Sequence, residues 1–309
     1  MEINLQKLFK QYINECKFSA CLQPETIRGY EAVFNLFLKL VPEVDTVDFL
    51  TPEMLNEFFK RIQTRQRIIG NNIIKTGVKK STIKTQWSKL NAFFAWLYKN
   101  NYIRKNPLKG IRPPRVYYDD FRKLEDGEIR KIYAAIILHS PNSFILRRDT
   151  VMVSLLLFCG LRKGELLSLL VSDIDIEKRE ISIRKETSKS IYTRVIKMHP
   201  TLLMNIKEYI KERNSKHYKT ANLIASNKED NGLTADGIKH WVNSLIVKSD
   251  VKFHLHQFRH TFACKLAEAD VSLFKIQRLM GHSDIKMTMR YARSLKTENM
   301  DDDIGKISI

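Results

Sequence analysis

Residues 104–120, RKNPLKGIRPPRVYYDD, divide this chain of 309 residues into two parts. The segment carries three prolines and a glycine and shows little hydrophobic periodicity, so neither a long helix nor a central strand can run through it. We therefore predict a linker at 113–120, with a first domain over 1–112 and a second over 121–309. Each part is long enough to bury a core of its own.

The first domain is predicted to be a small bundle of about four helices. Residues 51–63 begin with Thr51 as N-cap and Pro52 in the first turn, an order that typically starts a helix. The basic segment 64–80 is punctuated by glycine and asparagine and is predicted to be a loop. Apolar stripes at helical spacing comprise Ile27, Tyr30, Val33, Phe34, Phe37 and Leu38, and then Ile83, Trp87, Leu90, Phe94 and Leu97.

The second domain is predicted to mix helices with a short sheet. Residues 147–160 are almost wholly apolar, so they are expected to form its central helix. Apolar and polar residues alternate in stretches between 181 and 196, which predicts a β-hairpin with Lys189 near its turn. Further helices are predicted at 126–140, 201–214, 233–246, 256–269 and 272–281. The predicted fold class is mainly α with a small β-sheet.

The charge of the chain indicates a polyanionic partner. There are 53 lysines and arginines against 34 aspartates and glutamates, which gives a net charge of +19 and a pI near 9.7. Residues 1–118 carry 20 basic and 9 acidic residues, and the remainder carries 33 and 25. Because both parts are basic, both are expected to approach the phosphates of a nucleic acid.

A membrane location is not predicted. The chain has no uninterrupted apolar run of spanning length, and the N-terminal residues have scattered charges without an apolar signal core. The positive charge is also spread along the chain, whereas a membrane-surface protein usually concentrates it on one amphipathic helix. We therefore expect a cytoplasmic protein.

The four cysteines lack C-x-x-C spacing and are predicted to be reduced, mostly buried thiols. His256 and His260 have the spacing of a zinc-binding helix, but Gln257 stands where such a helix has glutamate. Arg259 beside them would repel a divalent cation. Since the chain also lacks the phosphate-binding loop of ATP-dependent enzymes, we expect neither a metal nor another cofactor.

The segment HLHQFRHTFA, residues 254–263, suits a phosphate better than a metal. In a helix, His256, Arg259 and His260 lie at i, i+3 and i+4 and share a face, while His254 points elsewhere. A guanidinium holds a phosphate through two parallel hydrogen bonds, and neighbouring imidazoles can add donors. The cluster therefore predicts a phosphate-binding site.

Two other residues have both a plain and a chemical interpretation. Arg162 follows Gly160 and is either a surface arginine paired with Glu165 or a second phosphate ligand. Tyr291 is either a packing residue or a nucleophile. A straight helix from His282 to Tyr291 would rise roughly 13 Å, so the chain has to bend if both meet one phosphate. Thr288 is the expected N-cap after that bend.

Taken together, these segments closely resemble the tyrosine recombinases, the family of phage integrases and Xer-type site-specific DNA recombinases. The matching segments are GLRKGELLSL around Arg162, the hairpin with Lys189, HQFRHTFA, LMGHS, and Tyr291 nine residues after His282. Residues 81–111 resemble the end of that family's core-binding domain. Phe258 replaces the family's usual leucine, and the hairpin lacks its common glycines. The resemblance implies a helical, SAM-like core-binding domain followed by an α+β catalytic domain.

The resemblance also implies a role for each matching residue. Arg162 and Arg259 would clamp the scissile phosphate, with donors or acceptors at His256 and His282, and Tyr291 would be the nucleophile. A lysine on the hairpin would protonate the leaving 5′-oxygen, for which Lys189 fits best and Lys185 competes. Glu165 and His260 are expected to support these groups without touching the phosphate.

The implied reaction cuts and rejoins double-stranded DNA through a 3′-phosphotyrosyl enzyme, passes through a four-way junction, and uses a tetramer on paired sites. It would serve integration and excision of a mobile element, or Xer-type resolution, with an accessory or heterologous recombinase as a possible partner. A type IB topoisomerase or a non-catalytic DNA-binding protein is the alternative.

Two surface features remain open at this stage. Lys79, Lys80 and Lys84 either contact DNA phosphates or form the solvated start of a helix. The C-terminal tail after Tyr291 is too short for another domain, and by the same resemblance it is expected to dock on a neighbouring protomer.

Overall fold

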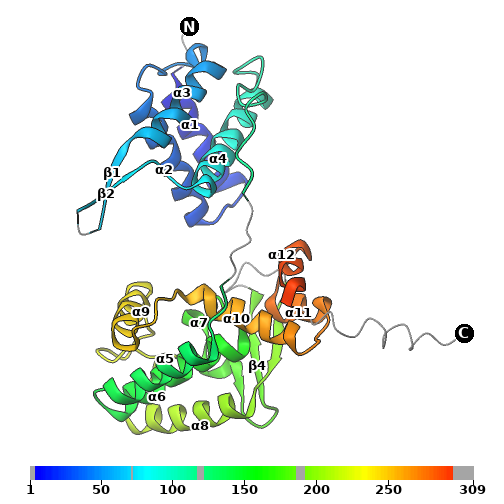
Figure 1. Cartoon of the computed structure of the whole chain (residues 1–309). Helices are drawn as coiled ribbons and strands as arrows, with labels where there is room; N and C mark the ends of the chain where they lie inside the picture. Colours follow the sequence, from blue (N-terminus) through cyan, green and yellow to red (C-terminus); the bar gives the residue numbers. More distant parts are fainter. Residues whose placement is uncertain (1–3, 71, 117–121, 186–191, 295–309) are drawn as a thin grey trace, which may run out of the picture. The chain divides into compact units, whose positions relative to one another are not determined.

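The computed structural model describes residues 4–70, 72–116, 122–185 and 192–294. The chain forms two compact units, Met1–Asp119 and Asp120–Ile309 (Figure 1). Residues 117–120 of the predicted linker, Lys189 and the end of the C-terminal tail lie outside the described residues. The prediction of a mainly helical fold with a small sheet is confirmed.

The first unit is a helical bundle around an aromatic core. Phe9 stacks on Phe34 with ring centroids 3.8 Å apart, and Phe93 meets Phe9 edge-on at 5.1 Å. Thr51 caps its helix by accepting a hydrogen bond from the backbone N–H of Met54, as the sequence predicted. The helices are α1 (Leu5–Asn14), α2 (Pro24–Leu40), α3 (Pro52–Thr64) and α4 (Lys80–Lys99), with a π-helical turn at Glu15–Ser19 and a 3-10 turn at Val47–Phe49.

The segment predicted as a loop between α3 and α4 contains a β-hairpin, so that prediction is wrong. Strands β1 (Gln66–Ile69) and β2 (Ile73–Thr76) pair in antiparallel register, with Ile68 opposite Ile74. The chain reverses between them through Gly70 and Asn72, both with positive φ. The available signal was the pair of isoleucines on each side of a Gly-Asn turn, which is a hairpin pattern.

The second unit is built around α6 (Ser143–Cys159), which is buried along most of its length and packs against α8 (Pro200–Ser215) and α10 (Leu255–Glu268). This arrangement confirms the prediction of a central apolar helix. The remaining helices are α5 (Asp126–His139), α7 (Lys163–Ser168), α9 (Ala235–Ser249), α11 (Leu273–Met280) and α12 (Lys286–Met289), with 3-10 turns at Val171–Asp173 and Arg290–Ser294.

A three-stranded antiparallel sheet covers one side of this core. Its strands are β3 (Ile174–Asp175), β4 (Glu180–Ile183) and β5 (Arg194–Lys197), in the order β3-β4-β5. Ile181 pairs with Ile196, and both side chains are buried. The predicted hairpin is therefore present, although the turn that carries Lys189 is not among the described residues.

None of the described helices is both long and apolar enough to cross a membrane. All four cysteines are free thiols. Cys16, Cys159 and Cys264 are buried, whereas Cys21 is exposed.

Candidate active site

Arg162 is positioned by the sharp end of α6. Gly160 ends this helix with φ 57°, and a Cβ there would lie 2.4 Å from the ring of Phe262, so glycine is required twice over. Arg162 then forms the N-cap of α7. Its guanidinium donates to Glu165 Oε1 at 2.8 Å and to the carbonyl of Gly281 at 3.1 Å. The side chain thus joins the start of α7 to the end of α11.

Glu165 is a buried anchor for two arginines. It accepts the backbone N–H of Arg162 at 2.9 Å and both terminal nitrogens of Arg194, at 2.8 and 3.1 Å. Burial alone would raise the pKa of Glu165, but hydrogen bonds and charge from Arg194 and Arg162 outweigh it and lower that pKa to about 2. Arg162 is therefore fixed by a buried charged network and is not a freely moving surface side chain.

Arg194 was given no role in the sequence analysis. It lies on β5 and points inward together with Ile196, while Val195 and Lys197 are exposed. An arginine at an inward position of a strand requires a buried carboxylate, and that requirement was the signal available in the sequence.

Arg259 is the largest fully buried side chain of the described chain and is 1% exposed. It donates to the carbonyl of Gly160 at 2.7 Å and to the carbonyl of Met280. These carbonyls belong to the C-terminal ends of α6 and α11, where the helix dipole favours a cation. Burial and the charge of Arg162 lower the pKa of Arg259 to about 9. The site thus holds two neighbouring guanidinium groups, whose positive charge exceeds the negative charge around them.

Three histidines surround this cation pair. The rings of His256 and His260 lie 4.4 Å apart on α10, nearly perpendicular to each other. Burial, with the charge of Arg259 among the further causes, lowers the pKa of His256 to about 4 and that of His260 and His282 to about 3. All three imidazoles are therefore neutral near pH 7, able to accept a proton at one nitrogen and donate from the other.

Tyr291 lies against the same helix. Its hydroxyl is 2.6 Å from Nδ1 of His260, and its ring is 2% exposed among apolar residues of α10 and α11. Burial raises the pKa of Tyr291 to about 12, although Arg259 and Arg290 oppose the rise. His260, which the sequence predicts to be a supporting residue, thus contacts the hydroxyl of Tyr291.

The chain bends between His282 and Tyr291, but Thr288 does not cap a helix there. Gly281 ends α11 with φ 61°, and α12 has Ile285 at its N-cap. Thr288 lies inside α12, where its Oγ1 is 2.8 Å from Nδ1 of His282. The prediction of a Thr288 N-cap is therefore wrong, because this hydroxyl is used to orient the histidine.

Of the two candidate lysines on the β4–β5 hairpin, Lys185 lies among the described residues. Lys189 lies outside the described residues. Lys185 is exposed, and its backbone N–H donates to Thr193 Oγ1 at 3.3 Å. Across the described parts of the chain, no group of three or more histidine, cysteine or acidic side chains could hold a metal ion.

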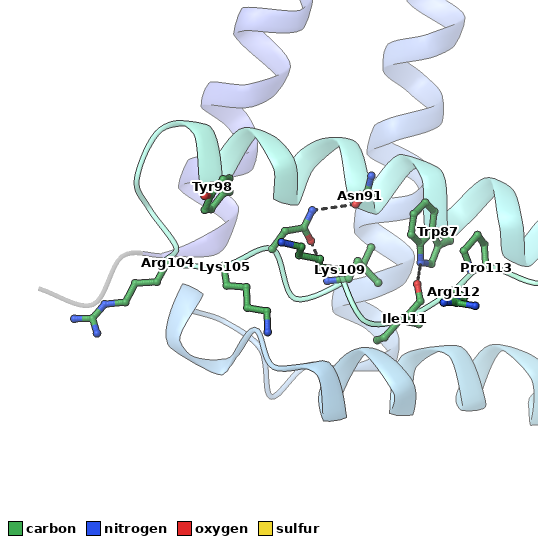
Figure 2. Close-up of a pocket in the computed structure, with 11 residues that line it drawn as sticks. Trp87, Asn91, Tyr98, Arg104, Lys105, Lys109, Ile111, Arg112 and Pro113 are labelled. Atoms are coloured by element: carbon green, nitrogen blue, oxygen red, sulfur yellow. Dashed lines mark hydrogen bonds between the residues drawn. The ribbon is translucent and has the colours of Figure 1, made fainter.

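The first unit carries basic groups on and beside α4. Lys79 and Lys80 are exposed at the start of this helix, and Lys84 is half-buried one turn later. Segment 104–113 lies along α4, held by a hydrogen bond from Trp87 Nε1 to the carbonyl of Ile111 and another between Asn106 and Asn91 (Figure 2). A hollow of about 680 Å³ lies between them, and its basic lining residues are Arg104, Lys105, Lys109 and Arg112.

Known proteins resemble this chain over nearly its full length. Tyrosine recombinase XerC of Bacillus subtilis is 25% identical over 95% of this chain and 92% of its own. A tyrosine recombinase of Agathobacter rectalis is 24% identical over 98% and 97%.

Solved structures show the same fold. The Tn1549 transposon integrase in complex with transposon right end DNA is 20% identical, covers 99% of this chain and 100% of its own, and has a TM-score of 0.75. A lambda integrase dimer bound to a core site is 18% identical over 94% and 95%, with a TM-score of 0.70. The model of the phage integrase family matches residues 122–298, more than half of the chain. The protein therefore belongs to the phage integrase family and is a DNA strand-transferring enzyme.

Proposed function

We propose that this enzyme is a site-specific tyrosine recombinase that cuts and rejoins duplex DNA through a 3′-phosphotyrosyl bond to Tyr291. The observation that carries the proposal is the pair of guanidiniums of Arg162 and Arg259, held at the ends of α6 and α11 beside neutral histidines. Among the described residues of the site, Glu165 is the only anion that balances these cations, and its carboxylate also binds Arg194. A DNA phosphate supplies the missing charge.

The two arginines act on the nonbridging oxygens of that phosphate. A phosphodiester carries one negative charge, and attack by an oxygen nucleophile raises it to two. Guanidiniums already fixed in place therefore bind the transition state more strongly than the ground state. Because burial and Arg162 make the charge of Arg259 unfavourable in the free enzyme, the arriving phosphate also relieves that repulsion.

The nucleophile needs a proton acceptor, since its hydroxyl has a pKa well above neutral pH. In the free enzyme the Tyr291 hydroxyl is at hydrogen-bond distance from His260. Because the ring is buried, the 3-10 turn that carries it has to shift before the hydroxyl can reach a DNA phosphate. We assign His256, next to His260, as acceptor in the reacting geometry.

His282 and a lysine complete the chemistry. When Thr288 donates to Nδ1 of His282, the proton of the neutral ring sits on Nε2 and can be donated to a phosphate oxygen. Lys189, on the hairpin between β4 and β5, protonates the departing 5′-oxygen. In the second step, the free 5′-hydroxyl of a partner DNA attacks the phosphotyrosyl bond. Tyr291 is released and the DNA linkage is restored.

Strand exchange between two sites requires several copies of the enzyme. A lambda integrase tetramer bound to a Holliday junction shares this fold, with a TM-score of 0.71. We propose a tetramer on paired double-stranded sites, in which Lys79, Lys80, Lys84 and the basic hollow beside α4 contact phosphates. The cellular task is integration and excision of a mobile element or Xer-type resolution.

Covalent trapping on random DNA fragments tests the proposal and identifies the recombination site in the same experiment. The enzyme is incubated with sheared DNA of its source organism, carrying random nicks so that the cleaved end diffuses away, and protein-linked DNA is recovered after denaturation. We expect recovered fragments to share one short sequence and Tyr291→Phe to recover none. Arg259→Lys, which keeps the charge but loses the two-pronged geometry, is expected to reduce the yield strongly.

Two outcomes would contradict the assignment. Adduct formation by Tyr291→Phe would mean that another residue is the nucleophile. Relaxation of supercoiled plasmids of any sequence, without exchange between two copies of the recovered site, would identify a topoisomerase.

A further inference from the structure

The β1–β2 hairpin projects from the helices of the first unit (Figure 1). Apolar side chains on both of its faces are exposed. Ile68 and Ile74, which are direct cross-strand partners, are 73% and 63% exposed. Ile73 belongs to the opposite face and is 55% exposed. A strand pair with uncovered isoleucines on both sides does not serve the core of its own unit, so these side chains are available to a partner.

The sequence around the hairpin indicates what kind of partner this is. Residues 58–118 contain 15 lysines and arginines and not one aspartate or glutamate, whereas residues 1–57 contain five basic and nine acidic residues. The hairpin lies in the carboxylate-free half, with Arg65 and Arg67 leading into and along β1 and Lys75 on β2. An apolar ribbon within such a field fits a polyanion and not an apolar protein surface.

The base of the hairpin is closed by hydrogen bonds and packs tightly against the end of α3. The backbone N–H of Gly77 donates to the carbonyl of Arg65 at 2.9 Å, and the Arg67 guanidinium donates to the carbonyl of Gly77 at 2.6 and 3.0 Å. Gly77 has φ 68°, and a Cβ there would meet the carbonyl oxygen of Gln63 in α3 at 2.4 Å. The ribbon therefore leaves the bundle in a set direction, so that less conformational entropy is lost on binding.

We infer that the β1–β2 hairpin is a DNA-reading arm that lies in the major groove of the recombination site. The major groove admits a two-stranded β-ribbon and displays thymine methyl groups, which apolar side chains contact. Ile68 and Ile74 provide the apolar contact, and the flanking Arg65 and Lys75 contact phosphates. A four-residue strand spans about 13 Å, which corresponds to roughly four base pairs.

This inference rests on the proposed function, because it adds sequence reading to a DNA-cutting enzyme. Its test uses binding alone. Random-sequence 40-base-pair duplexes are selected for binding to the full-length Tyr291→Phe protein, and the base preference at each position is determined. The selection is repeated with Ile68→Thr/Ile74→Thr, which retains β-branched residues so that the strands still form. Ile137→Thr, at an exposed isoleucine of α5, is the matched control.

We expect the double variant to lose preference over one block of about four base pairs, by roughly tenfold for each thymine that is read. The control should keep the preference. Replacing thymine by deoxyuridine in that block, which removes only the methyl group, should weaken binding of the Tyr291→Phe protein. The effect on the double variant should be smaller, because threonine keeps only one of the two methyl groups of isoleucine. Lys75→Gln should weaken binding to every sequence and reduce the salt dependence by about one phosphate contact.

Two results would overturn the proposed DNA-reading role of the hairpin. The first is an unchanged base preference in the double variant, or a selection in which the Tyr291→Phe protein shows no such block. The second is insensitivity of the Tyr291→Phe protein to deoxyuridine. If an unchanged preference is accompanied by weaker self-association in sedimentation, the hairpin is instead a contact between copies of the chain. The proposed chemistry is checked separately. Ile68→Thr/Ile74→Thr, with Tyr291 retained, should still form the covalent adduct on a site that was selected with the unmodified hairpin.

Discussion

The two antiparallel hairpins of this protein use the same residue types in opposite ways. In β4–β5 of the second unit, Ile181 and Ile196 are paired and buried in the core. In β1–β2 of the first unit, Ile68 and Ile74 are paired in the same manner and face solvent. Strand propensity thus explains both hairpins, but only the surroundings decide whether the apolar face supports the fold or is left for a partner.

Arginine follows the same division. Arg194 on β5 points inward and meets Glu165, which also holds Arg162. Arg67 on β1 instead donates to a backbone carbonyl at the base of its own hairpin. A buried arginine with a carboxylate connects β5 to the proposed phosphate site, whereas the arginine of β1 holds the base of its own hairpin. Substitutions in the two hairpins should therefore differ in both stability and chemistry.

The largest effect on stability is expected when the buried carboxylate of Glu165 is removed. Glu165→Ala leaves Arg194 buried without its charged partner and releases Arg162, so unfolding of the second unit should become easier by about 4 kcal/mol. Covalent trapping should also fall sharply. Urea unfolding is followed by Trp241 fluorescence in a Trp87→Phe/Trp96→Phe background, because Trp241 is then the remaining tryptophan and lies in the second core.

The matched control for this change is Lys197→Ala. Lys197 lies on the same strand and pairs with Glu180, but its side chain is exposed. Its removal should change the unfolding free energy by at most about 0.5 kcal/mol. Equal losses for the two variants would show that the buried pair has no special part in holding β5.

Acid should weaken the second unit through the same carboxylate. The pKa of Glu165 is about 2 in the folded chain against an ordinary value of 4.5, so its contribution is fully present above pH 4.5. That contribution is lost as the pH falls from 4.5 towards 2, because the unfolded chain takes up the proton first. The expected loss is up to about 3 kcal/mol, measured by Trp241 fluorescence as above.

Glu165→Gln provides the reference for this titration, since the amide has a similar shape and no proton to gain. Its stability should depend less on pH than that of the wild-type protein between pH 4.5 and 2. Parallel curves for the two proteins would mean that other carboxylates account for the acid sensitivity.

The difference between the hairpins also explains what could be predicted from the sequence. Alternating burial along β4 and β5 leaves a periodic pattern, so that hairpin was expected, whereas Ile68–Ile74 is surrounded by lysine, asparagine and glycine and was interpreted as a loop. The residues of the candidate site were recognised by order and local motif. The sequence did not show which histidine contacts Tyr291. His260 and Tyr291 are 31 positions apart, and their contact depends on how α10 packs against the last turn.

The smallest expected effect comes from isoleucine-to-valine substitutions in the two hairpins. They separate the contribution of burial from that of strand propensity, because isoleucine and valine are both β-branched. Ile181→Val removes one methylene from the core of the second unit and should destabilise it by about 1 kcal/mol. Ile74→Val removes the same group from an exposed position in the first unit and should leave unfolding unchanged within about 0.5 kcal/mol. Since Trp241 reports only on the second unit, Ile74→Val is followed with the Trp87 and Trp96 signals in a Trp241→Phe protein. If Ile74→Val costs as much as Ile181→Val, the β1–β2 ribbon is packed against its own bundle, and its isoleucines are not free to read DNA.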